Sequence, residues 1–166
     1  MISIIACVGR NLELGKKGGL CFHIPDDLKF FKETTMGFPV LMGLSTWHSL
    51  PGKLPGRKHY VLSFDEKEKL PDGVEVVTNL PKFLKKWQGN STKLFIIGGG
   101  SVYKQCLDSA EEMFLTEVEA EDKEADVFFP KFDQKSWERS VISTQTFENL
   151  TYSFVHYQRI RQEKHS

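Results

Sequence analysis

The sequence is organised around one stretch, Ile96-Ile97-Gly98-Gly99-Gly100-Ser101-Val102-Tyr103, in which an apolar run passes into a glycine triplet and then into a helical pattern. We interpret it as the end of a buried strand, a tight turn and the start of a helix. Such a turn presents backbone N–H groups at the helix N-terminus, where phosphate binds well. It matches neither the Gly-x-Gly-x-x-Gly dinucleotide fingerprint nor a Walker loop, which would carry a lysine. Taken alone, it is also compatible with a purely structural turn.

A second stretch repeats this arrangement. Gly43-Leu44-Ser45-Thr46 follows a short apolar strand predicted over residues 39–42 and opens a helical turn that extends to Leu50. Two strand–glycine–helix turns of this kind could bind the two ends of one pyrophosphate. Together they favour a dinucleotide-binding protein over a protein with two merely structural turns.

The rest of the chain predicts a single α/β domain over residues 1–166. Short buried strands are predicted over residues 2–8, 58–63, 74–78 and 93–97, and helices over residues 25–36, 81–87 and 100–107. Because strands and helices alternate, this part of the sheet should be mostly parallel. Residues 113–119, 137–144 and 151–161 show the alternation typical of antiparallel strands. Residues 9–23 hold four glycines and are predicted to form a long loop, and the polar residues 161–166 are expected to fray.

Composition limits the partners of this domain. The 22 basic and 22 acidic residues give a net charge of zero, so no nucleic acid or anionic membrane is expected to bind. No apolar run approaches the length of a membrane span, and no leader is evident, so we expect a cytoplasmic monomer with a small-molecule partner. The three cysteines and five histidines lack the spacing of metal ligands, and no metal site is expected.

One acidic residue has an unusual position. Pro25-Asp26-Asp27-Leu28 opens a predicted helix, where proline and acids are both favourable. Asp26 is explained by that role, but Asp27 shares an apolar stripe with Phe31. A buried acid beside a glycine-rich loop can pair with an amidine-like substrate edge or manage a proton. No second carboxylate and no Ser-His-Asp or Cys-His pattern accompanies it.

An arginine follows a predicted turn in Leu54-Pro55-Gly56-Arg57-Lys58. Most arginines in such positions are solvated surface charges. A fixed guanidinium at the start of a strand can instead hold a carboxylate in bidentate fashion.

In this order, these pieces resemble dihydrofolate reductase of the bacterial type, over essentially the whole chain. The matching stretches are Met1-Ile2-Ser3-Ile4-Ile5-Ala6, Ile24-Pro25-Asp26-Asp27-Leu28, Phe31-Lys32, Pro39-Val40-Leu41-Met42-Gly43, Thr46-Trp47, Leu54-Pro55-Gly56-Arg57-Lys58, Ile97-Gly98-Gly99-Gly100-Ser101-Val102-Tyr103, Leu115-Thr116 and Phe129-Pro130. The resemblance implies an eight-stranded, mostly parallel sheet with an antiparallel C-terminal edge strand and four flanking helices. It also implies a cleft that binds NADPH, dihydrofolate and antifolate inhibitors, and a role in one-carbon metabolism.

The resemblance implies a hydride transfer to C6 of the pterin with protonation at N5, which yields tetrahydrofolate. Asp27 would be the ionisable side chain on the pterin, supported by Thr116 from a neighbouring strand. Orientation, desolvation and a tuned acid would supply the catalysis, without a covalent intermediate.

The resemblance also places binding residues by position. Apolar residues would line the folate pocket, with Arg57 on the glutamate tail: Ile5, Leu28, Phe31, Leu50, Leu54 and Ile97. The cofactor would meet backbone groups of Ala6 and Cys7, the lid residues Leu14 and Gly15, and the two glycine turns with their flanks: Gly43, Leu44, Ser45, Thr46, Ser63, Phe64, Gly98, Gly99, Gly100, Ser101, Val102 and Tyr103. Gly98-Gly99 matches the position of a rare cis peptide bond, and residues 9–23 match a mobile lid.

The chain departs from the family pattern at both ends of this cleft. Phe22 replaces a tryptophan whose indole N–H helps to hold a water near the substrate. Leu44, Phe64 and Ser101 stand where polar or basic residues usually meet the adenosine 2′-phosphate. Each lost charged hydrogen bond is worth about 1.5–3 kcal/mol, so NADH is an alternative to NADPH, and nearby Asp65 could favour an unphosphorylated ribose.

Two other functions are compatible with parts of this pattern. Another pterin or flavin-precursor reductase of the same fold would not need Arg57, because its substrate lacks the glutamyl tail. A non-catalytic nucleotide-binding module would explain the glycine turns but not Asp27 on an apolar stripe.

Overall fold

The computed structural model describes residues 1–65 and 69–161. Its centre is an eight-stranded sheet in the order β10-β11-β8-β1-β7-β4-β5-β6. Along the chain these strands are β1 (Ile2–Val8), β4 (Val40–Gly43), β5 (His59–Leu62), β6 (Val74–Val77), β7 (Leu94–Ile96), β8 (Glu112–Val118), β10 (Trp137–Phe147) and β11 (Leu150–Arg159). The predicted fraying of the chain end falls on residues 162–166, which lie outside the described residues.

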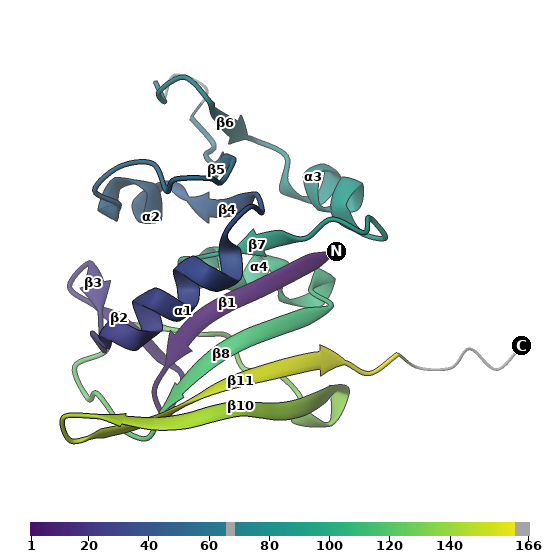
Figure 1. Cartoon of the computed structure of the whole chain (residues 1–166). Coiled ribbons are helices and arrows are strands. Elements are labelled where there is room, and N and C mark those ends of the chain that lie inside the picture. Colours follow the sequence, from purple (N-terminus) through teal and green to yellow (C-terminus); the bar gives the residue numbers. More distant parts are fainter. Residues whose placement is uncertain (66–68, 162–166) are drawn as a thin grey trace, which may run out of the picture.

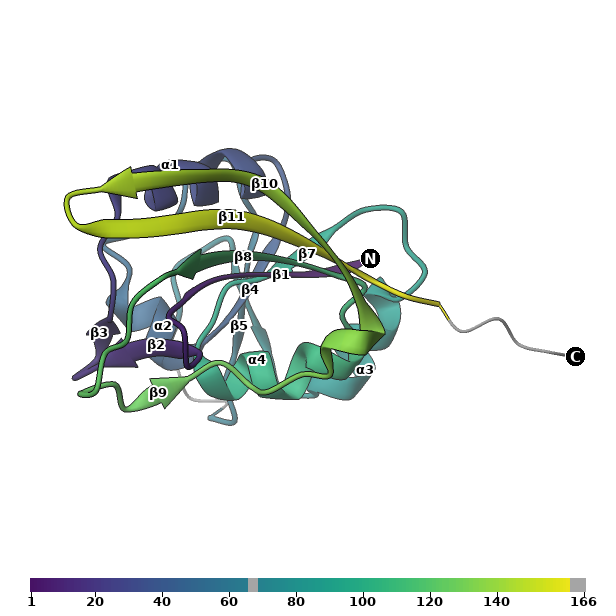
Figure 2. The same cartoon turned by 90° about the horizontal axis from the view of Figure 1, so that it is seen from below.

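The four α-helices of the described residues cover the two faces of this sheet. They are α1 (Pro25–Thr35), α2 (Leu44–Ser49), α3 (Leu80–Trp87) and α4 (Gly100–Cys106). Figures 1 and 2 show α1 over one face and α3 and α4 over the other. The chain begins α1 with Pro25 and two acids in the first turn, where a fixed φ and negative charge both favour a helix. None of these helices is long and apolar enough to cross a membrane.

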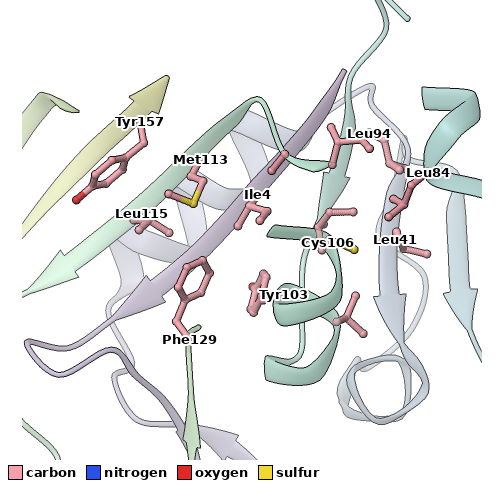
Figure 3. Packing of buried hydrophobic residues seen from close by; sticks show 14 of the residues in the cluster. Ile4, Leu41, Leu84, Leu94, Tyr103, Cys106, Met113, Leu115, Phe129 and Tyr157 are labelled. Carbon is pink, nitrogen blue, oxygen red and sulfur yellow. The ribbon is translucent and has the colours of Figure 1, made fainter. Parts of the chain in front are cut away.

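Alternating side chains of the central strands build two cores. On the face of α3 and α4, Ile2, Ile4 and Val8 of β1 pack with side chains of α3, α4 and β8 (Figure 3). The intervening Ile5 faces α1 and packs with Val40, Met42 and Phe95, together with partly buried aromatic residues of α1. A strand that is buried on both faces reads as a continuous apolar run, which is the pattern of the first eight residues.

The direction of β8 corrects one sequence expectation. Residues 113–119 were expected to form an antiparallel strand, but β8 pairs in parallel with β1, from Ser3↔Glu112 to Val8↔Glu117. The α4 crossover carries the chain from β7 back to the same end of the sheet, and this connection favours a parallel neighbour. The C-terminal strand β11 is antiparallel to β8, as expected, and lies one position in from the edge, which is formed by β10.

The loop expected over residues 9–23 contains two short strands, so that expectation is partly wrong. β2 (Glu13–Lys16) pairs with β3 (Gly19–Leu20) and with β9 (Val127–Phe128) in a separate three-stranded sheet. The sequence of residues 9–23 shows no strand pattern because these strands are very short and one partner is distant in the chain. The small sheet lies beside the end of β1 (Figure 2).

Candidate active site

The acid predicted from the sequence lies where α1 meets the central strands. Asp27 is in the first turn of α1, and the hydroxyl of Thr116 on β8 donates a hydrogen bond of 2.5 Å from Oγ1 to Asp27 Oδ1. The thiol of Cys7 on β1, the register partner of Thr116, lies beside the same carboxyl group and lowers its pKa. The structure therefore brings together one carboxylate and two neutral donors from three elements.

Burial controls the acidity of this group. Removal from water raises the pKa of Asp27 above its ordinary value of 3.8, and the hydrogen bonds from Thr116 and Cys7 lower it in part. In the described part of the chain, no lysine, arginine or histidine forms an ion pair with Asp27. A carboxyl group in this environment holds its proton at higher pH than a solvated aspartate, which suits an acid in catalysis.

An apolar wall lies on the α1 face of the sheet, the face that carries Asp27. Side chains predicted for the folate pocket belong to one cluster on this face: Ile5, Phe31, Leu50 and Ile97. Leu28, the residue after Asp27, is 58% exposed, and Leu54 is half-buried. An exposed leucine beside a half-buried acid offers apolar surface that a ligand can cover.

Arg57 lies at the outer end of this wall and is not a solvated surface charge. Its side chain is buried, Nε donates to the Pro55 carbonyl oxygen at 3.1 Å, and a second nitrogen donates to Thr35 Oγ1 at 3.4 Å. Burial lowers the pKa of the guanidinium from 12.5. Among the described residues it forms no ion pair, although a buried guanidinium gains most from a carboxylate partner.

His59 has a role in this wall that the sequence did not reveal. Its buried imidazole accepts a 2.9 Å hydrogen bond at Nε2 from the backbone N–H of Leu54. Burial lowers the pKa of the ring, so it stays neutral and can accept. His59 thus fixes the loop that presents Leu54 and Arg57. No spacing signal could have shown this, because one histidine at the start of a strand is unremarkable by sequence.

The two glycine turns lie against each other, as the sequence predicted. The backbone N–H of Gly43 donates to the carbonyl oxygen of Gly98 at 2.9 Å, and the Gly98-Gly99 peptide bond is cis. A Cβ added at Gly98 or at Gly99 would lie 3.5 Å from Thr46 Oγ1, so the missing side chains leave space beside a hydroxyl group. Gly98 has a φ of 128°, which favours glycine. This space, edged by a hydroxyl and by helix-start N–H groups, fits the phosphates of a dinucleotide.

Tyr103 supports this region rather than offering an open binding surface. Its side chain is only 5% exposed, and its hydroxyl donates to the carbonyl oxygen of Ile5 at 2.7 Å. Burial raises the pKa of this phenol, so it remains a donor. Val102 is also buried, and both side chains lie beneath the glycine turns.

The outer end of the candidate cofactor site offers few polar groups. Leu44 is half-buried and packs against the apolar cluster of the α1 face, whereas Phe64 is 80% exposed. The Ser63 hydroxyl is buried and accepts a hydrogen bond from the Asp65 N–H at 3.2 Å. The Ser101 hydroxyl accepts from the Gln105 amide at 3.1 Å. None of these four side chains carries a positive charge that could pair with a phosphate.

The segment expected to act as a lid is tied to the rest of the chain by a buried acid. Glu13 is 1% exposed, and its two carboxylate oxygens accept backbone hydrogen bonds from Asn11 and from Asp122, each at 2.6 Å. Phe22 packs on the cluster around Ile24. Sequence reasoning missed Glu13, because its second partner lies 109 residues away.

Known proteins share this arrangement. The family model described as dihydrofolate reductase matches residues 1–159. The chain belongs to the dihydrofolate reductase family. It is 39% identical to the dihydrofolate reductase of Neisseria gonorrhoeae over 163 residues, which cover 94% of this chain and 96% of the relative. It is also 32% identical to that of Bacillus subtilis, with 99% and 98% covered.

Solved structures lead to the same dihydrofolate reductase fold. The dihydrofolate reductase from Enterococcus faecalis, complexed with NADP(H) and RAB-propyl, matches with a TM-score of 0.85 and 26% sequence identity. The match covers 96% of each chain. The family and the fold expected from the resemblance are therefore confirmed, including the mostly parallel eight-stranded sheet.

Proposed function

We propose that this chain reduces 7,8-dihydrofolate to tetrahydrofolate with NADPH. One observation carries the proposal: a half-buried carboxyl, Asp27, faces two neutral donors on the sheet face that carries the apolar wall, and two glycine turns lie against each other nearby in the fold. When bound, NADPH supplies the hydride that reaches C6 of the pterin. A proton at N5 completes the reduction.

Asp27 binds and orients the pterin in this proposal. Its carboxylate accepts hydrogen bonds from the amino and amide nitrogens of the ring, and its raised pKa favours the protonation of N5. Thr116 holds one carboxylate oxygen through its hydroxyl. The apolar wall excludes water, and this strengthens each of these electrostatic contacts.

Arg57 selects a substrate with an anionic tail. Its position, buried and held by Pro55 and Thr35, leaves guanidinium donors for the α-carboxylate of the glutamate. A reductase of the same fold that acts on a pterin or flavin precursor without this tail would gain nothing from a buried guanidinium here. The substrate class is therefore a folate.

The cofactor site is assigned to the glycine turns and their flanks. Backbone groups at Gly98, Gly99 and Gly100 and the Thr46 hydroxyl would hold the pyrophosphate. Ala6, Cys7, Leu14 and Gly15 would surround the nicotinamide. Phe22 keeps the bulk of an aromatic residue near the substrate but has no N–H donor. We infer that the enzyme works as a cytoplasmic monomer and binds diaminopyrimidine antifolates through Asp27.

The test measures the oxidation of NADPH and of NADH with dihydrofolate in wild type, Asp27→Asn and Asp26→Asn. Loss of a positioned acid typically lowers the rate about 10²–10⁴-fold, and we expect this for Asp27→Asn. Asp26 is a matched control, since it is exposed and its carboxylate only accepts from the Tyr152 hydroxyl. Turnover without dihydrofolate dependence, or equal loss in both variants, would contradict the proposal.

A further inference from the structure

Cys7 lies next to Thr116 on the face of the sheet that carries Asp27. The two residues are register partners on the parallel strands β1 and β8. Register partners in adjacent strands point their side chains to the same face. Cys7 accordingly packs against the buried cluster that contains Ile24, the residue before α1. The fold therefore sets a thiol and a hydroxyl side by side under the first turn of the helix.

Both groups meet the same carboxyl. The Thr116 hydroxyl donates to Asp27 Oδ1, and the thiol of its register partner Cys7 lies beside the same carboxyl and lowers its pKa. Burial raises the pKa of the Cys7 thiol well above its ordinary value, and the nearby Asp27 raises it further. Cys7 is therefore an uncharged thiol, and an S–H group can only donate to a carboxylate. The geometry gives Asp27 two donors where a carbon side chain at residue 7 would leave one.

We propose that Cys7 is a positioning residue for Asp27, whose carboxylate its thiol holds, together with Thr116, in the orientation that faces the substrate. The proposal rests on the proposed function only where it names the substrate. The contact itself belongs to the free protein. It gives the side chain of Cys7 a role distinct from that of its backbone, which was expected to meet the nicotinamide.

Two buried phenols near Asp27 do not change charge in the working range of the site. Tyr103 on α4 and Tyr152 on β11 both face it, and burial raises the pKa of both phenols, to about 12 for Tyr152. Tyr103 donates to the Ile5 carbonyl and Tyr152 donates to Asp26. Neither phenol therefore contributes to a pH dependence that responds to Cys7.

The first test compares the pH dependence of single-turnover hydride transfer in wild type, Cys7→Ala, Cys7→Ser and Cys106→Ala. Loss of a weak donor to the carboxylate raises its pKa. In Cys7→Ala, the falling limb of the curve of rate against pH should therefore move to higher pH by about half a unit. Cys7→Ser keeps a donor and should hold the limb at or below its wild-type position. Cys106 is a matched control: a buried thiol on α4 that packs in the core of the opposite face.

A purely structural role for Cys7 gives a different result. The loss of packing would then lower the stability of Cys7→Ala and leave the falling limb unchanged, and this would overturn the proposal. A limb that moves equally in Cys7→Ala and Cys7→Ser would overturn it as well, because the serine keeps the donor.

The second test needs neither turnover nor a folded Cys7→Ala variant. The infrared S–H stretch of Cys7, assigned by its absence from Cys7→Ser, should move to higher frequency in Asp27→Asn, because an amide oxygen is a weaker acceptor than a carboxylate. The S–H bands of Cys21 and Cys106 are internal references. An unchanged Cys7 band in Asp27→Asn would refute the contact. A shifted band in a protein that does not reduce dihydrofolate would uphold the contact and refute the proposed function.

Discussion

Glu13 offers a direct measure of how the small sheet is attached to the rest of the molecule. Its carboxylate accepts two backbone hydrogen bonds of 2.6 Å, from Asn11 and Asp122, in a site that is 1% exposed. Hydrogen bonds to a charged group are worth about 1.5–3 kcal/mol each. Glu13→Ala removes both, and water can solvate part of what is released. We therefore expect the free energy of unfolding to fall by about 3 kcal/mol, the lower end of that sum.

Denaturant unfolding of wild type, Glu13→Ala and Glu13→Gln measures this loss, and amide hydrogen exchange locates it. The glutamine keeps one carbonyl acceptor and turns an NH₂ group toward the other backbone donor, so an intermediate loss is expected. Exchange should accelerate most at the amides of Asn11 and Asp122. Glu124→Ala is the control, since Glu124 is exposed and its Oε2 lies as far as 4.0 Å from Lys16 Nζ. Such surface pairs contribute about 0–1 kcal/mol.

The reasoning fails if Glu13→Ala unfolds at the same denaturant concentration as Glu124→Ala. It also fails if a loss of stability leaves the two amides as protected as in wild type. The carboxylate would then fill space in the core without tying residues 9–23 to the segment around Asp122.

Three further predictions concern the tail, the cofactor and acid stability. Arg57→Leu should raise the KM for dihydrofolate about 10-fold or more, because a charged hydrogen bond is lost. The same variant should have little effect on the KM of a pterin substrate without the glutamate. Equal effects on both substrates would contradict the role of Arg57. Leu44→Arg should raise the NADPH over NADH ratio of kcat/KM by about 10-fold, as measured by steady-state kinetics, and an unchanged ratio would place the 2′-phosphate elsewhere. Burial raises the pKa of Glu112, but hydrogen bonds from Lys93, Ser3 and His156 outweigh it and hold the folded pKa below 4.5. The stability from Glu112 is therefore complete above its unfolded pKa and lost as pH falls through the folded pKa, so Glu112→Gln should show a shallower acid dependence of unfolding free energy than wild type.

Local pattern was sufficient for most elements of this fold. The apolar run of residues 2–8, the proline and acids that open α1, and the two strand–glycine–helix turns all predicted the structure found. The direction of β8 was predicted wrongly because strand direction depends on the connection and on the neighbour, not on alternation within the strand. The two strands in residues 9–23 were missed because they are too short for a period to show.

The candidate site, like the fold, was predicted from the sequence only in part. Asp27 was identified by an acid on an apolar stripe, and its partner Thr116 was named only through the family resemblance. Its distance of 89 residues along the chain gives no local signal. No sequence pattern predicted that the side chain of Cys7 lies beside Asp27, because this placement depends on the register of β1 against β8.

The sequence by itself determined the elements, the glycine turns and the unusual acid, because these follow from side-chain periodicity and backbone freedom within a few residues. Tertiary structure decided which donors reach Asp27, how Arg57 is buried, and which backbone groups Glu13 binds. Such contacts join residues that are far apart in the chain, through strand pairings that no short segment encodes. The residue types therefore specify which chemical groups the site contains. The register between the paired strands decides which of these groups meet.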